Sequence, residues 1–389
     1  MSFRLPAILG AALLSACDEP APEHVEPAAD PAAPAPLTDW PVTRGGPTLQ
    51  GRINGPAPKD PAIDWTFTLD NPSVAEAALS EGTLIVGDLM GFIHAIDFET
   101  RKLRWKFETG DTIEGAATIH DGAVFVGSGD QSFHALELTD GSKRWSIEGL
   151  EKFPSAANVI PAPDGNGFHL ILNGYDGICR CINPADGKEI WQYETNDYIN
   201  GTPALIGTDR IAFGGCDSVI HVLDAATGKP VNEILTDAQI TDSVASLGST
   251  VYSGNYANQV VAAEIDAEEP TWIYQGDDFP FFSAPAVDDA RVYIGCRDKA
   301  LHAIDRETGK KVWVFATGGR VESSPIVFDD AVVFGSSDGR LYAVNPEDGT
   351  ELWRLDLGEK LTASPIFAQD RIIIAGGAGT VFVIGSGGG

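Results

Sequence analysis

The chain has 389 residues, a length that permits one large domain or several ordinary ones. Glycine occurs 43 times and methionine only twice, a balance that favours an all-β fold of short strands and tight turns over packed helices. The formal net charge of −30 argues against nucleic acid as a partner, because the long-range field of the protein repels a polyanion. High acidity aids solubility, and it also occurs in proteins that work at high salt, where charges are screened.

Residues 1–16 are typical of a lipoprotein signal peptide. Arg4 precedes the apolar run Leu5–Leu14, which is too short to cross a bilayer as a helix. The run ends in Leu14-Ser15-Ala16-Cys17, which resembles a bacterial lipobox and implies cleavage after Ala16 and acylation of Cys17. We therefore expect a lipid anchor on Cys17 that holds the protein on a membrane.

Residues 17–39 consist mainly of Pro, Ala, Glu and Asp, a composition that cannot bury a core and favours extended conformations. We expect these residues to form a disordered tether. It would hold the folded part of the protein at the cell envelope, facing the periplasm. Asp18 resembles a signal for retention at the inner membrane. The sequence therefore leaves two locations for the anchor, the outer membrane, which is favoured, and the inner membrane.

An internal repeat organises residues 40–385. The segments 84–105, 292–313 and 332–353 align without a gap, and a slot of small residues recurs from Gly87 to Ala375 in steps of 40, 46, 41, 40, 41, 40 and 40. An aromatic slot follows the same irregular rhythm, with Asn232 in place of one tryptophan. This structural repeat comprises Trp65, Trp105, Trp145, Trp191, Trp272, Trp313 and Trp353. A period near 40 residues is the mark of a repeat architecture.

Each repeat contains short runs of alternating apolar and polar residues, such as Leu341-Tyr342-Ala343, which predict β-strands. Turn pairs such as Asp140-Gly141 and Asp348-Gly349 separate the runs and predict hairpins. Four strands fit one repeat, which predicts the blade of a β-propeller, since only a ring of neighbours buries both apolar faces of each blade.

The ring is expected to close with eight blades. Subtracting 40 from Trp105 gives position 65, which is a tryptophan, whereas adding 40 to Trp353 passes the last residue. The strand near Ile63–Leu69 should therefore complete the last blade beside Val381–Ile384 and cover an otherwise open edge. Residues 386–389 are expected to form a flexible tail.

The repeated pattern GSSDGRLYAVNPEDGTELW (335–353) resembles the tryptophan-docking repeat of the pyrroloquinoline-quinone-like propeller family. Trp40-Pro41-Val42-Thr43-Arg44-Gly45-Gly46 resembles the segment that precedes the first blade in this family. The resemblance implies one of two functions: a BamB-type lipoprotein that scaffolds outer-membrane protein insertion, or a dehydrogenase that holds pyrroloquinoline quinone with Ca²⁺ over the central channel. Fold alone does not choose between them.

The loops that follow the tryptophan strands should line one mouth of the channel. Their equivalent positions carry polar and aromatic side chains that we expect at a funnel rim: Glu114, Asn200, Asp242, Phe282 and Glu322. By resemblance to the dehydrogenases, Glu114, Asn200 and Asp242 would be metal ligands and Asp242 would be the catalytic base. The adjacent cysteines of that branch are missing, and a solvated acidic rim without cofactor or metal is the favoured interpretation. Such a rim would attract a cationic ligand.

Two further residue sets could suggest metal sites. His94, His134, His221 and His302 share one slot in different blades, but sheets pack about 10 Å apart, too far for one zinc ion. Cys179 and Cys181 should face the apolar side of a blade as buried thiols, although pairing among Cys179, Cys181, Cys216 and Cys296 stays open.

The sequence thus predicts a non-enzymatic propeller lipoprotein that binds envelope proteins, including the machinery that inserts outer-membrane β-barrels. Two alternatives remain: a quinone-dependent dehydrogenase, and a sensor of cations or small molecules that uses the funnel.

Overall fold

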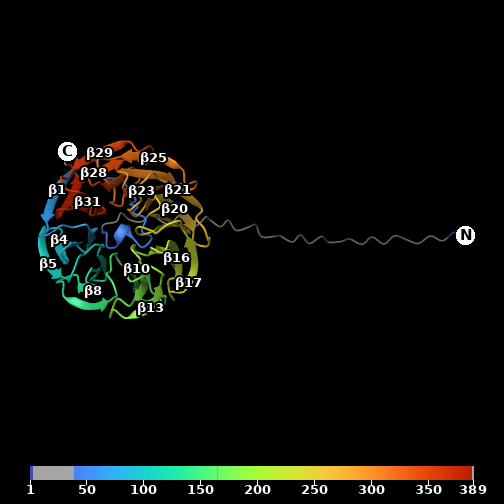
Figure 1. Ribbon diagram of the computed structural model, residues 1–389, viewed down its shortest axis with the longest axis horizontal. Coiled ribbons are helices and arrows are strands. Elements are labelled where there is room, and N and C mark those ends of the chain that lie inside the picture. The colour runs from blue at the N-terminus through green and yellow to red at the C-terminus, as the bar shows by residue number, and fades with distance from the viewer. Residues whose placement is uncertain (3–38, 164, 388–389) are drawn as a thin grey trace. The chain divides into compact units, whose positions relative to one another are not determined.

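The computed structural model describes residues 1–2, 39–163 and 165–387. Cys17, Asp18 and nearly all of the expected signal peptide and tether therefore lie outside the described residues. From residue 39 onward, eight four-stranded antiparallel sheets surround a central axis (Figure 1). Among the described residues the only helix is the 3-10 turn η1 (Thr43–Gly45), so no described helix is long and apolar enough to span a membrane. The predicted eight-bladed all-β propeller is confirmed.

The first seven blades each use four consecutive strands, from the innermost to the outermost. Blades 1 to 4 comprise β2 (Ala78–Ser80), β3 (Thr83–Gly87), β4 (Phe92–Asp97) and β5 (Lys102–Glu108); β6 (Thr118–His120), β7 (Ala123–Gly127), β8 (Ser132–Glu137) and β9 (Lys143–Glu148); β10 (Asn158–Pro161), β11 (Phe168–Asn173), β12 (Ile178–Ile182) and β13 (Glu189–Glu194); and β14 (Ala204–Ile206), β15 (Arg210–Gly214), β16 (Val219–Asp224) and β17 (Pro230–Leu235).

Blades 5 to 7 comprise β18 (Ala245–Leu247), β19 (Thr250–Gly254), β20 (Gln259–Glu264) and β21 (Trp272–Gln275); β22 (Ala286–Val287), β23 (Arg291–Cys296), β24 (Ala300–Asp305) and β25 (Lys311–Ala316); and β26 (Ile326–Val327), β27 (Val332–Gly335), β28 (Arg340–Val344) and β29 (Glu351–Asp356). Blade 8 comprises β30 (Ile366–Ala368), β31 (Arg371–Ala375), β32 (Thr380–Ser386) and β1 (Pro61–Thr68).

The N-terminal strand closes the ring. Strand β1 pairs antiparallel with β32, with Trp65 opposite Val383 and Thr66 opposite Phe382. In Figure 1, β1 in blue accordingly lies beside the red C-terminal strands. The predicted closure is thus confirmed, and it satisfies the backbone groups of a strand edge that would otherwise be open.

Burial follows position within a blade. The middle strands are almost fully buried, as in β7, because both of their faces pack against neighbouring blades. The outermost strands alternate between exposed and partly buried residues, as in β29, because they form the outer wall. A blade is therefore stable only between two neighbours.

Five tryptophans join consecutive blades by one repeated contact. Each indole N–H donates to a backbone carbonyl in the outer hairpin turn of the next blade, at 2.9–3.1 Å. A glycine three residues after that carbonyl lies flat against the indole, where a Cβ atom would overlap the ring. Each glycine has a positive φ, which other residues adopt only at a cost. The pairs are Trp105 with Leu138 and Gly141, Trp145 with Pro184 and Gly187, Trp191 with Ala225 and Gly228, Trp272 with Arg306 and Gly309, and Trp313 with Pro346 and Gly349.

Two of the remaining slots use other chemistry. Asn232 replaces the indole and donates its amide to the carbonyls of Ile265 and Ala267. Trp65 packs edge-on against Phe98 at 5.4 Å, beside Arg101 at 5.8 Å from the ring centre. Arg101 has a φ of 61° at the position where the five turns docked on tryptophans carry glycine.

Candidate functional site

A polar funnel lies at the mouth of the central channel. It is a cavity of about 170 Å³ whose wall is formed by the loops that lead from the outer strand of one blade to the inner strand of the next. Of the residues expected at the rim, Glu114, Asn200, Asp242 and Glu322 line this one cavity. Phe282 is half-buried and is not part of its lining.

The segment before β1 also lines the funnel, because it runs around the inside of the channel. It forms the blue coil at the centre of the ring in Figure 1. Its backbone bonds to the inner strands of successive blades: Trp40 to Leu79, Pro41 to Ile119, Pro47 to Leu205, Thr48 to Ser246, Gln50 to Val287 and Gly51 to Val327. In blade 3 the Asn158 amide donates to Pro47 at 2.8 Å. One segment thereby contacts the first seven blades in order.

Arg44 is the charged residue of this segment and is buried, with 3% of its surface exposed. Its guanidinium donates to the backbone carbonyls of Pro285, Ser324 and Pro325 at 2.5–3.4 Å. Burial lowers the pKa of Arg44, whereas the carboxylates of Glu76 and Asp242 raise it. Arg44 is thus held as a cation between two blades by their carbonyls and two acids.

Glu76 completes the contact from blade 1. It accepts hydrogen bonds from the Trp40 indole, the Thr43 hydroxyl and the Arg44 backbone N–H, each at 3.0 Å. Burial raises the pKa of Glu76, and Arg44 opposes the shift. Burial likewise raises the pKa of Asp242, against the Ser243 hydrogen bonds and the charge of Arg44. Arg44 and Glu76, both buried, and the partly buried Asp242 form one charge group, which we call the Arg44 cluster.

The polar rim residues already have partners. Lys152 Nζ lies 2.8 and 3.2 Å from the two carboxylate oxygens of Glu114, and the Arg297 guanidinium pairs with Glu322 at 2.5 Å. The Asn200 amide contacts Cys216 Sγ at 3.3 Å.

A calcium–quinone centre does not fit this arrangement. The oxygens of Glu114 that would bind Ca²⁺ face an ammonium group instead. The cavity equals the liquid volume of about six water molecules and is smaller than the pockets of about 300–1,000 Å³ that hold organic ligands.

Aromatic side chains on blades 3 to 6 lie beside the paired cations of the funnel, with Lys152 over the Tyr175 ring and Arg297 over the Phe282 ring. Tyr175 and Tyr198 stack with their ring centres 4.3 Å apart, and Phe282 meets Tyr256 edge-on at 5.1 Å. Burial, with Cys216, Tyr198 and Tyr256 nearby, raises the pKa of Tyr175. Tyr198 and Tyr256 are each 47% exposed, and Phe279 is 48% exposed. We call Tyr175, Tyr198, Tyr256, Phe279 and Phe282 the aromatic rim.

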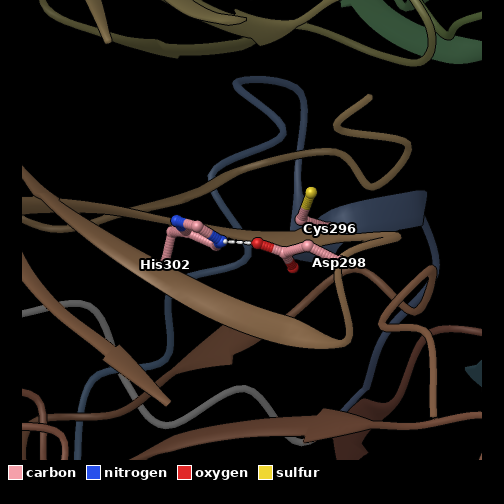
Figure 2. Close-up of side chains that lie close together, drawn as sticks. All are labelled: Cys296, Asp298 and His302. Carbon is pink, nitrogen blue, oxygen red and sulfur yellow. Dashed lines mark hydrogen bonds and ion pairs between the residues drawn. The ribbon is translucent and has the colours of Figure 1, made fainter. Parts of the chain in front are cut away.

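A group of potential metal ligands lies in blade 6. Cys296, Asp298 and His302 place one ligand atom each within 4.8 Å of one another, and Figure 2 shows the His302 imidazole directed at Asp298, at 2.8 Å. Cys296 Sγ contacts the Phe279 carbonyl at 3.3 Å, and burial raises the pKa of its thiol to about 12, which disfavours the thiolate that a metal needs.

A carboxylate bonds to the equivalent ring in other blades, in which no cysteine occupies the position of Cys296. His94 bonds to Asp88 at 2.8 Å and His221 to Asp217 at 3.0 Å, while Tyr342 donates to Asp338 in the equivalent place. The pair is therefore a structural element of the repeat that fixes the turn between the second and third strands. The four cysteines in the described part of the chain are free; Cys179, Cys181 and Cys296 are buried, and Cys216 is partly exposed.

Sequence reasoning missed the Arg44 cluster and the aromatic rim. Glu76 lies two residues past the slot used to predict the rim, where the other blades carry Ala, Thr, Val or Ser. Glu76 is the only acid at that position, and Arg44 is an arginine of the segment before the first blade. These two residues are the signal that could have indicated a buried contact between opposite charges.

Eight blades, tryptophan-docked turns and a polar funnel define a pyrroloquinoline-quinone-like propeller. The family model described as outer membrane protein assembly factor BamB matches residues 50–214 and 216–389, so the chain belongs to that family. No curated protein sequence matches the chain.

Solved structures from both functional branches are similar. BamB from Moraxella catarrhalis is 19% identical with a TM-score of 0.71, covering 84% of this chain and 97% of that chain. The quinohemoprotein alcohol dehydrogenase from Comamonas testosteroni is 13% identical with a TM-score of 0.79, covering 92% and 82%. A europium-containing methanol dehydrogenase is 11% identical with a TM-score of 0.72, covering 88% and 90%. At these identities the similarity shows the fold alone.

Proposed function

We propose that this chain is a protein-binding scaffold of the bacterial envelope that works with the machinery for inserting outer-membrane β-barrels. The observation that carries the proposal is the aromatic rim. Its tyrosines and phenylalanines are exposed or partly exposed and two pairs are in ring contact, so they offer the large, rigid contact area that dominates protein interfaces. Membership of the BamB family supports the same role.

Charge around the rim specifies the kind of partner surface. Asp197, Asp277 and Asp278 are exposed beside the aromatic residues, within a chain of net charge −30. Lys152 and Arg297, the nearby cations, are paired with Glu114 and Glu322. A partner with apolar side chains flanked by Lys or Arg would complement this surface.

The experiment compares affinity purifications from envelope extracts. We expect Tyr198→Ser combined with Tyr256→Ser to reduce recovery of the β-barrel insertion machinery about tenfold or more, as loss of aromatic anchors does. Leu235→Ser is the matched control, because Leu235 is 64% exposed on the outer strand β17 and is not part of the aromatic rim. Equal recovery with both variants would refute the proposal.

Attachment through Cys17 is part of the proposed function. A lipidated Cys17 would place the scaffold on a membrane with its propeller in the periplasm, on the outer membrane unless Asp18 retains it on the inner one. Cys17→Ser should move the protein from the detergent phase to the aqueous phase, and sucrose-gradient fractionation of membranes tests which one carries it.

The dehydrogenase alternative is tested by thermal melting with pyrroloquinoline quinone and Ca²⁺. Because Glu114 is paired and the cavity is small, we expect no rise in melting temperature. A clear rise that Asp242→Ala abolishes would favour the enzyme over the scaffold.

A further inference from the structure

At one place, the seam between blades 7 and 8, the tryptophan slot has no hairpin turn of the next blade to dock on. Trp353 occupies the same slot as Trp313, but blade 8 has no outer hairpin turn, because its two outer strands come from opposite ends of the chain. Strand β32 ends at Ser386 and β1 begins at Pro61, and a bond from the Gly387 N–H to the Asp60 carbonyl, at 2.9 Å, lies at the open end.

The missing turn leaves Trp353 without the carbonyl that the other indoles have. Within residues 39–163 and 165–387, no hydrogen-bond acceptor lies at the Trp353 indole N–H. The five equivalent indoles are bonded at 2.9–3.1 Å, whereas the Trp353 side chain is partly exposed, so its indole N–H is open to water or to a ligand.

A cavity of about 460 Å³ lies at this place, which we call the seam pocket. Trp353 and Leu352 form one wall, and Pro58 and Lys59 of the segment leading into β1 form another. Leu352 is 47% exposed, so apolar surface faces the opening. The volume equals that of about fifteen water molecules, which is room for a short turn.

The chain itself defines what fits such a pocket, because it fills five equivalent sites with one kind of segment. We propose that the seam pocket binds an exposed β-hairpin turn of another protein, with a glycine against the Trp353 indole and the indole N–H donating to the carbonyl three residues before that glycine. A second copy of the chain does not supply this turn, since its own turns of this form are docked on Trp105, Trp145, Trp191, Trp272 and Trp313. The seam pocket is a site separate from the aromatic rim.

The test uses indole N–H resonances in ¹⁵N-tryptophan-labelled full chain carrying Cys17→Ser. The probe is a backbone-cyclised peptide of residues 303–312, Ala-Ile-Asp-Arg-Glu-Thr-Gly-Lys-Lys-Val, the turn that docks on Trp272. Trp353→Phe assigns the Trp353 resonance. The control peptide replaces the glycine equivalent to Gly309 by valine, whose side chain would overlap the indole.

We expect the peptide to move the Trp353 resonance while those of the five docked tryptophans stay in place. The valine peptide should bind about tenfold or more weaker. The proposal is wrong if millimolar peptide leaves the Trp353 resonance unmoved, or if both peptides move it equally. It is also wrong if deletion of Gly388 and Gly389 alone moves the resonance, since the chain's own end would then occupy the pocket.

Discussion

Replacing Arg44 by methionine tests whether the Arg44 cluster fastens the N-terminal segment inside the channel. Methionine keeps an unbranched apolar side chain but removes the charge that faces Glu76 and Asp242. The guanidinium forms no direct ion pair with either acid, but its removal leaves three backbone carbonyls without their donor and two carboxylates without a compensating charge, which costs about 3 kcal/mol or more. We expect a loss of about that size in the free energy of unfolding near pH 7.5.

The loss should depend on pH with a defined sign. Burial already raises the pKa values of Glu76 and Asp242, and without Arg44 both rise further. A carboxyl group whose pKa is higher in the folded state favours folding at low pH, and this contribution is lost as pH rises through the folded-state value. Each further unit of pKa difference is worth about 1.4 kcal/mol, so the deficit of Arg44→Met should be smaller at pH 5 than at pH 7.5.

Urea unfolding at the two pH values, followed by tryptophan fluorescence, measures the deficit. Arg44→Met combined with Glu76→Gln is the control, because the neutral amide keeps the side-chain shape and removes one unpaired charge. This double variant should be more stable than Arg44→Met at pH 7.5 and show less pH dependence. A deficit of the same size at both pH values, or strict additivity of the two substitutions, would refute the electrostatic account.

Three further predictions concern the repeat. Gly349→Ala should destabilise the protein by at least about 1 kcal/mol more than Gly358→Ala in urea unfolding, because both residues have a positive φ but only a Cβ at Gly349 overlaps an indole, that of Trp313. Equal losses would contradict the docking contact. Burial lowers the pKa of His134, so stability should fall as pH drops from 7 to 5, and His134→Phe should reduce that fall; an unchanged pH profile would exclude His134 as its source. In the full chain carrying Cys17→Ser, a thiol reagent should label one cysteine of the native protein, Cys216, because Cys216 is partly exposed whereas Cys179, Cys181 and Cys296 are buried. Labelling that survives Cys216→Ser would contradict this assignment.

The blade count and ring closure could be predicted because every repeat carries the same marker residues at the same spacing. The slots of Trp105 and Gly141 recur with one rhythm, and a side chain's place in one blade gives its place in the next. The same logic placed Glu114, Asn200, Asp242 and Glu322 on one cavity. Features fixed by the repeat were therefore accessible from the residues alone.

The features that could not be predicted depend on contacts that occur only once in the structure. The segment before β1 has no repeat, and its path follows from single bonds such as that from Ser246 to Thr48. Lys152 pairs with Glu114 because neighbouring loops meet across 38 residues of sequence, a pairing that no periodicity encodes. The position of Arg44 likewise depends on carbonyls from blades 6 and 7, which belong to the far end of the chain.

Closure by β1 also has a consequence for the order of folding. The strand that leaves the ribosome first finds its partner in β32, the strand made last, more than 300 residues later. Until β32 exists, β1 has no strand to pair with, and blade 8 cannot be completed between blades 7 and 1. The complete ring can therefore form only after the whole chain has been synthesised, so a chaperone that shields an unclosed propeller would act during that interval.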